Sequence, residues 1–90
     1  MLDIVLSNKF KRDLKLAKKR GCNIKLLQKV VDTLAQEQEL DPIYRDHELN
    51  GEYRGFRECH IEPDWLLIYR ISQGAVELFL FRTGTHSDLF

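Results

Sequence analysis

Residues 46–69 read DHELNGEYRGFRECHIEPDWLLIY and hold two of the three histidines of the chain, together with arginines and several carboxylates. Successive side chains of a strand point to opposite faces, so Glu58 and His60 fall on the same face. The acid-proline-acid sequence at residues 62–64 is typical of a tight turn. The stretch therefore predicts two strands joined by a turn, with an acid and an imidazole side by side.

The segment after this turn is apolar on both faces. Residues 65–71 read WLLIYRI, and a strand with so little alternation is typical of the centre of a sheet. Gln73 and Gly74 suggest a two-residue hairpin that leads into a further strand at residues 75–82. Upstream, Asn50-Gly51 signals a tight turn, and Gly55 suggests a bulge inside a strand.

The first forty residues change from a strand pattern to a helical one. Residues 2–6 are a short strand candidate, and Ser7 follows as the N-cap of a helix that extends to about Arg20. Asn23 caps a second helix that ends before the sequence Leu-Asp-Pro at residues 40–42. Its expected buried stripe consists of Leu27, Val30, Val31 and Leu34.

These elements predict an α+β fold in a single domain over residues 1–90. Two N-terminal antiparallel helices pack on one face of a mainly antiparallel sheet of four to five strands, and the early strand joins the same sheet. Ninety residues are enough for one ordinary core and too few for two domains.

The composition indicates the cellular compartment in which the protein is expected. No apolar run approaches the ~20 residues that span a bilayer, and the N-terminus lacks the features of a signal peptide. We therefore expect a cytoplasmic protein without membrane contact. Cys22 and Cys59 stand singly, which favours reduced thiols over a disulfide. No metal-ligand spacing is present, so we expect neither a metal nor a cofactor.

The net charge of zero conceals a strong polarity along the chain. Residues 1–30 contain nine lysines and arginines but only two acids, a balance of +7, so the remaining residues carry −7. Such asymmetry suggests a polyanionic partner for the basic half, although a basic helix face is also compatible with plain solvated surface.

Histidines and arginines with neighbouring carboxylates suit the cleavage of RNA without a metal. A base takes the proton of the 2′-hydroxyl, its oxygen attacks phosphorus, an acid protonates the leaving 5′-oxygen, and an arginine neutralises the developing charge. The sequence has no P-loop, GxGxxG, GxSxG or HExxH motif to support other chemistries. The candidate residues are His47, His60, His86, Arg57, Arg82, Glu58 and Asp64.

The segment at residues 46–69 and the ending RTGTHSDLF at residues 82–90 resemble the RelE/ParE superfamily of toxins, and within it the YafQ-like mRNA interferases. These motifs lie in the second half of the chain, whereas the helical half agrees in length and pattern only. The resemblance implies a toxin of a type II toxin–antitoxin system, a ribosome-dependent endoribonuclease that cuts mRNA in the A site and inhibits translation.

The resemblance also assigns roles to single residues. His86 matches the principal catalytic histidine, expected to be the general acid, and Arg82 matches a phosphate-binding arginine. His47, His60 and Asp64 match the other proton-transfer and orienting positions, and either histidine can be the general base. Further expected substrate contacts are Phe90, Arg57 and Glu58; Glu58 stands where relatives often have Asp, and we rank it below Asp64.

Partners and alternatives follow from the same resemblance. We expect a cognate antitoxin, the ribosome with its mRNA, and promoter DNA only through the antitoxin complex. Lys11, Lys15 and Lys18 lie on one outward strip of the first helix and are expected to meet ribosomal RNA. The alternatives are a non-enzymatic ParE-like toxin that binds gyrase, and a toxin–antitoxin co-repressor of its own operon.

Overall fold

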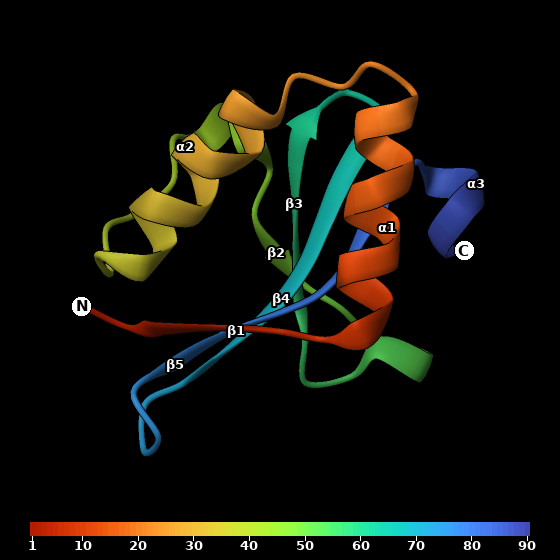
Figure 1. The fold of residues 1–90 in the computed structure, drawn as a ribbon. Coiled ribbons are helices and arrows are strands. Elements are labelled where there is room, and N and C mark those ends of the chain that lie inside the picture. The colour runs from red at the N-terminus through yellow and green to blue at the C-terminus, as the bar shows by residue number, and fades with distance from the viewer.

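The computed structural model describes all 90 residues as a five-stranded sheet with two helices against one of its faces (Figure 1). None of its helices has the length and apolar character needed to cross a membrane. The regular elements are β1 (Asp3–Leu6), α1 (Asn8–Lys19), α2 (Ile24–Ala35), β2 (His47–Glu48), β3 (Arg57–Glu62), β4 (Trp65–Ser72), β5 (Glu77–Gly84) and α3 (His86–Leu89), with short 3-10 turns at Pro42–Tyr44 and Gly51–Tyr53.

The sheet has the strand order β1-β5-β4-β3-β2. The pairs β2–β3, β3–β4 and β4–β5 are antiparallel, and only β1 runs parallel to its partner, β5. This arrangement confirms the predicted α+β fold with two N-terminal helices and a mainly antiparallel sheet.

The predicted helix ends are confirmed. The Ser7 hydroxyl accepts a hydrogen bond from the Phe10 N–H, and the Asn23 side chain accepts one from the Lys25 N–H. Gly21 has a φ of 82°, which suits glycine in the turn between the helices. In Figure 1 the chain rises through α1 and returns through α2, which tilts away from α1 across the sheet.

Two apolar clusters lie on opposite faces of the sheet. The inner face, the side toward α1 and α2, carries Cys59, Leu67 and Tyr69 and packs against the predicted helix stripe. The outer face carries Leu66 and Ile68, which pack with Leu89 of α3 and with aromatic residues of the turn before β3. Glu58 and His60 pair in register with Ile68 and Leu66, so both belong to the outer face, as predicted.

Three details differ from the sequence predictions. The hairpin between β4 and β5 has four residues, 73–76, because β5 begins only at Glu77. Gly55 lies in the turn before β3, with a φ of 93°, and does not form a bulge within a strand. The register shifts at two other places: between His60 and Glu62 in β3, and between Ile68 and Tyr69 in β4, where Phe81 is an extra residue in β5.

Candidate active site

A buried carboxylate lies between two imidazoles on the outer face. Glu58 Oε1 is 3.5 Å from His47 Nε2 and 3.6 Å from His60 Nε2. The antiparallel pairing of β2 with β3 places His47 directly opposite Glu58, and strand alternation brings His60 to the same face. The glutamate is only 3% exposed, and its Oε2 has no hydrogen-bond partner.

Backbone contacts define which nitrogen of each ring carries a proton. Nδ1 of His47 is 2.7 Å from the Arg45 carbonyl, and Nδ1 of His60 is 3.3 Å from the Pro63 carbonyl. A carbonyl only accepts hydrogen bonds, so Nδ1 is the donor in both rings and a neutral ring leaves Nε2 bare toward Glu58. Glu58 therefore makes a hydrogen bond with either ring only when the three side chains share an additional proton. This arrangement is suited to taking up a proton.

The third histidine begins the short helix α3. The N–H of His86 donates to Asp64 Oδ1 at 3.0 Å, which ties α3 to the turn between β3 and β4. Thr85 and Asp88 form a capping box that satisfies the free backbone N–H groups of this turn. His60 contacts the same β3–β4 turn through Pro63, so the turn joins the two parts of the candidate site. Asp64 thus orients the backbone of His86.

Side-chain contacts hold the rest of α3 in place. Arg20, directly after α1, donates two hydrogen bonds to Asp88, the shorter at 2.6 Å. The Tyr53 hydroxyl donates to the Leu89 carbonyl at 2.9 Å. Phe90 lies beside the exposed His86 ring, with ring centroids 5.0 Å apart. The imidazole is therefore free while its helix is fixed from three sides.

The Asp88 contacts predict a loss of stability in acid. The Arg20 guanidinium, followed by the Thr85 N–H, lowers the pKa of Asp88. A carboxyl whose pKa is lowered by folding stabilises the protein above its unfolded pKa of about 4 and loses this effect as the pH falls toward the folded pKa. We expect wild type to be more stable than Asp88→Asn at neutral pH, with the difference shrinking below about pH 4.

Urea unfolding of both proteins across this range measures the effect. Asp41→Asn is the control, because Asp41 caps only the separate 3-10 turn at residues 42–44. A wild-type advantage over Asp88→Asn that stays constant down to pH 2 would rule out the linkage.

Arg82 is already paired. Its Nε and Nη2 donate to the Asp13 carboxylate at 2.7 and 3.1 Å, and the Thr83 N–H donates to the same group. These hydrogen bonds are the main reason that the pKa of Arg82 is raised, and Tyr53 adds to the shift. Two of the five N–H donors of the guanidinium are used by Asp13, which leaves three for a phosphate. Asp13 thus fixes the direction of Arg82.

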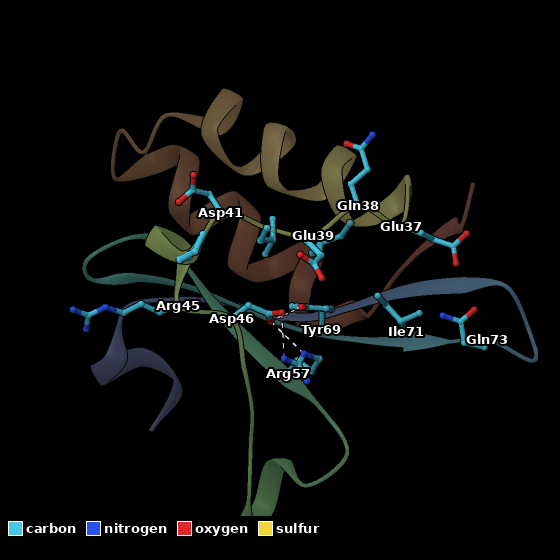
Figure 2. Close-up of a pocket in the computed structure, with 13 residues that line it drawn as sticks. Glu37, Gln38, Glu39, Asp41, Arg45, Asp46, Arg57, Tyr69, Ile71 and Gln73 are labelled. Atoms are coloured by element: carbon cyan, nitrogen blue, oxygen red, sulfur yellow. Dashed lines mark hydrogen bonds and ion pairs between the residues drawn. The ribbon is translucent and has the colours of Figure 1, made fainter.

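Arg57 lies away from the histidines. It points to the inner face, where it donates two hydrogen bonds to Asp46, which also accepts one from the Tyr69 hydroxyl (Figure 2). These residues line a cavity of about 570 Å³ below the end of α2. The position does not support the substrate contact expected of Arg57, which acts here as a structural partner of Asp46.

The lysines expected to meet ribosomal RNA lie at the surface, and the two cysteines are free thiols. Lys11, Lys15 and Lys18 are exposed along α1, the helix that lies next to α3 in Figure 1. Cys59 is fully buried, and burial raises the pKa of its thiol, so it offers no nucleophile. Cys22 is also a free thiol.

Sequence reasoning missed three residues that shape the site. Asp13 lies in α1 and Arg20 directly after it, both far along the chain from the residues they hold, so no local pattern pointed to them. Tyr53 stands within the motif but had no assigned role. The Thr85 and Asp88 capping box, in contrast, is readable from its spacing alone.

Comparison with known proteins agrees with this architecture. The mRNA interferase toxin YafQ of Escherichia coli (strain K12) is 40% identical over 90 residues, which cover 98% of this chain and 95% of that protein. The crystal structure of a metal-bound toxin from Helicobacter pylori is 53% identical, with a TM-score of 0.94 and full coverage of both chains.

A second solved structure shows a relative together with its partner. In the crystal structure of the E. coli DinJ–YafQ complex, the matching chain is 38% identical to this one, with a TM-score of 0.91 and coverage of 100% of this chain and 99% of that one. The sequence model described as "Bacterial toxin of type II toxin-antitoxin system, YafQ" matches residues 2–90. The chain therefore belongs to the YafQ family of bacterial toxins of type II toxin–antitoxin systems, within the RelE/ParE superfamily.

Proposed function

We propose that this protein is a ribosome-dependent endoribonuclease that cuts mRNA in the A site. The main support is the buried carboxylate of Glu58, which lies between His47 and His60 and has one oxygen without a hydrogen-bond partner. Relatives named mRNA interferases support the same reaction class. A gyrase-binding toxin has no use for such a proton-accepting cluster.

The geometry suggests which side chains accept, donate and neutralise charge in the reaction. The cluster of Glu58, His47 and His60 takes the proton from the 2′-hydroxyl, whose oxygen then attacks the adjacent phosphorus and forms a 2′,3′-cyclic phosphate. His86 gives a proton to the leaving 5′-oxygen, and Arg82 neutralises charge on the phosphoryl oxygens. One proton is taken up and one is released, so the reaction balances without a cofactor.

Two solved relatives from H. pylori contain a metal: a metal-bound toxin and a copper-bound mutant toxin. In this chain no group of three or more His, Cys, Asp or Glu side chains has the geometry to hold a metal ion. No step is therefore assigned to a metal. Metal independence stays a prediction.

The charge of the protein supports ribosome dependence. Affinity for free RNA comes mainly from phosphate neutralisation, and a chain of zero net charge supplies little of it. Binding energy from the ribosome then positions the message for cleavage. Primer extension tests this: purified protein should cut ribosome-bound mRNA and leave free mRNA intact, with DNA supercoiling unchanged in cells. Equal cutting of free mRNA, or an early loss of supercoiling, would count against the proposal.

The lysines of α1 are the expected contact with ribosomal RNA. Lys11, Lys15 and Lys18 are exposed and share one helix face. Reversing all three to Glu should lower ribosome co-sedimentation at least tenfold, because several phosphate contacts become repulsive. Thermal unfolding should change little, since isolated surface charges contribute less than about 1 kcal/mol each.

Lys25→Glu with Lys29→Glu on α2 serves as the matched control, since both residues lie outside the proposed contact. If the α1 triple variant sediments with ribosomes and cuts their mRNA as wild type does at physiological salt, the lysines are solvated surface only.

We also propose that a cognate antitoxin, encoded beside this protein, binds it and blocks its activity, as the DinJ–YafQ pairing of the relative suggests. The complex, rather than the toxin alone, would then occupy promoter DNA. Co-expression of the neighbouring reading frame should restore growth and yield a stable complex; growth arrest that persists beside a well-expressed neighbour would remove this partner.

A further inference from the structure

A connected series of aromatic rings crosses the outer face and ends at His86. Phe79, Phe81 and Phe56 form its first part, with Phe56 and Phe81 stacked at 4.6 Å and Phe79 at 6.0 Å from Phe81. Tyr53 follows at 6.1 Å from Phe81, and Phe90 at 5.3 Å from Tyr53. We call these five residues the aromatic strip. The His86 ring continues it, 5.0 Å from Phe90.

Two cations lie over the strip. The Arg70 guanidinium is 5.0 Å from the Phe56 ring and 5.4 Å from the Phe79 ring, and Lys9 Nζ is 5.9 Å from the Phe81 ring. Both side chains belong to exposed residues, and neither has a carboxylate within 4 Å, unlike Arg20, Arg57 and Arg82. Their charges are therefore uncompensated within the chain.

We propose that the aromatic strip, with Arg70 and Lys9, binds single-stranded RNA. The inference rests on the proposed nuclease function and adds a binding site for the message beside the scissile phosphate. Bases stack on aromatic rings and on the plane of a guanidinium, while cations bind the phosphates between them. Because the strip ends at His86, RNA bound along it leads directly to the candidate acid.

The chemistry of the strip favours RNA over a protein partner. The strip offers rings and positive charge over its length, and this combination can stack bases and bind the phosphates between them. Acids occur just beyond it, since Glu77 lies two residues before Phe79 and faces Asp3 in register. These carboxylates repel phosphate and limit the site to a short stretch of message.

The test uses mRNA that carries 4-thiouridine beside the cleavage site and a 2′-deoxynucleotide at it, which prevents cleavage. Ultraviolet cross-links on the ribosome should map to peptides containing Arg70, Phe79 or Phe81. On cleavable mRNA, Arg70→Ala should lower kcat/KM about tenfold, mainly through KM, the loss expected from removing one stacking partner. Arg70→Lys should recover only part of it, because lysine keeps the charge without the plane.

Lys25→Ala on α2, on the other side of the sheet, is the matched control, and unchanged thermal unfolding confirms that Arg70→Ala folds. Cross-links confined to α3, or wild-type kinetics for Arg70→Ala, would overturn the inference. So would a loss of antitoxin affinity in Arg70→Ala with unchanged cleavage, which would make the strip a protein-binding surface. If wild type fails to cut any mRNA, the nuclease proposal fails, while the cross-links to the uncleavable message still support or refute the strip.

Discussion

Replacing His86 by alanine should lower ribosome-bound mRNA cleavage by about 10²–10⁴-fold, the usual contribution of a general acid or base. The imidazole is exposed, and the only backbone contact of this residue with Asp64 is made through its N–H, which alanine retains. The capping box of Thr85 and Asp88 also persists. The fold and α3 should therefore remain while the proton donor is lost.

Single-turnover cleavage on programmed ribosomes, with thermal unfolding as a check of the fold, measures this effect. Ser87→Ala is the matched control, since Ser87 is the exposed neighbour in the same helix. Cleavage by a folded His86→Ala variant at the wild-type rate would remove His86 from the mechanism.

Replacing Glu58 by glutamine should reduce cleavage by a similar 10²–10⁴-fold without destabilising the protein. The amide keeps the shape of the carboxylate but cannot take up a proton. Its NH₂ group can donate to a bare Nε2 of His47 or His60, so the variant gains a hydrogen bond that the ionised carboxylate makes only with a protonated ring. Removing a buried charge that lacks a full set of partners should leave the melting temperature equal or higher.

Glu48→Gln is the control for this substitution, because Glu48 is the exposed neighbour in β2 and pairs with Arg57 on the other face. A Glu58→Gln variant that unfolds at a much lower temperature would show that the carboxylate is structural. One that is stable and fully active would show that the histidines act without it.

Strand alternation predicted from sequence which side chains of the candidate site share a face. It placed Glu58 and His60 on one face of β3, and pairing with β2 added His47. The same alternation places Arg57 on the opposite face, where its contacts with Asp46 are found. Arg57 was expected to contact substrate because it is close to the histidines along the chain. Its position in the strand does not support that role.

The sequence did not predict contacts between residues far apart in the chain. Asp13 and Arg82 are 69 positions apart, and they meet only because α1 packs against β5. Asp64 ranked above Glu58 by family resemblance, yet it holds the backbone of His86, whereas Glu58 lies between two imidazoles. Such roles depend on tertiary packing, which local patterns do not specify.

In the proposed reaction the 2′-hydroxyl attacks the phosphorus, and side chains alone move the protons. Its most direct test is the chemical identity of the new mRNA ends after cleavage on ribosomes, with a chelator selective for transition metals present and magnesium retained. We expect undiminished cleavage, a 2′,3′-cyclic phosphate and a free 5′-hydroxyl, and no cleavage when the nucleotide before the cut is 2′-deoxy. A 5′-phosphate with a 3′-hydroxyl, or cleavage that requires added zinc or copper, would contradict it.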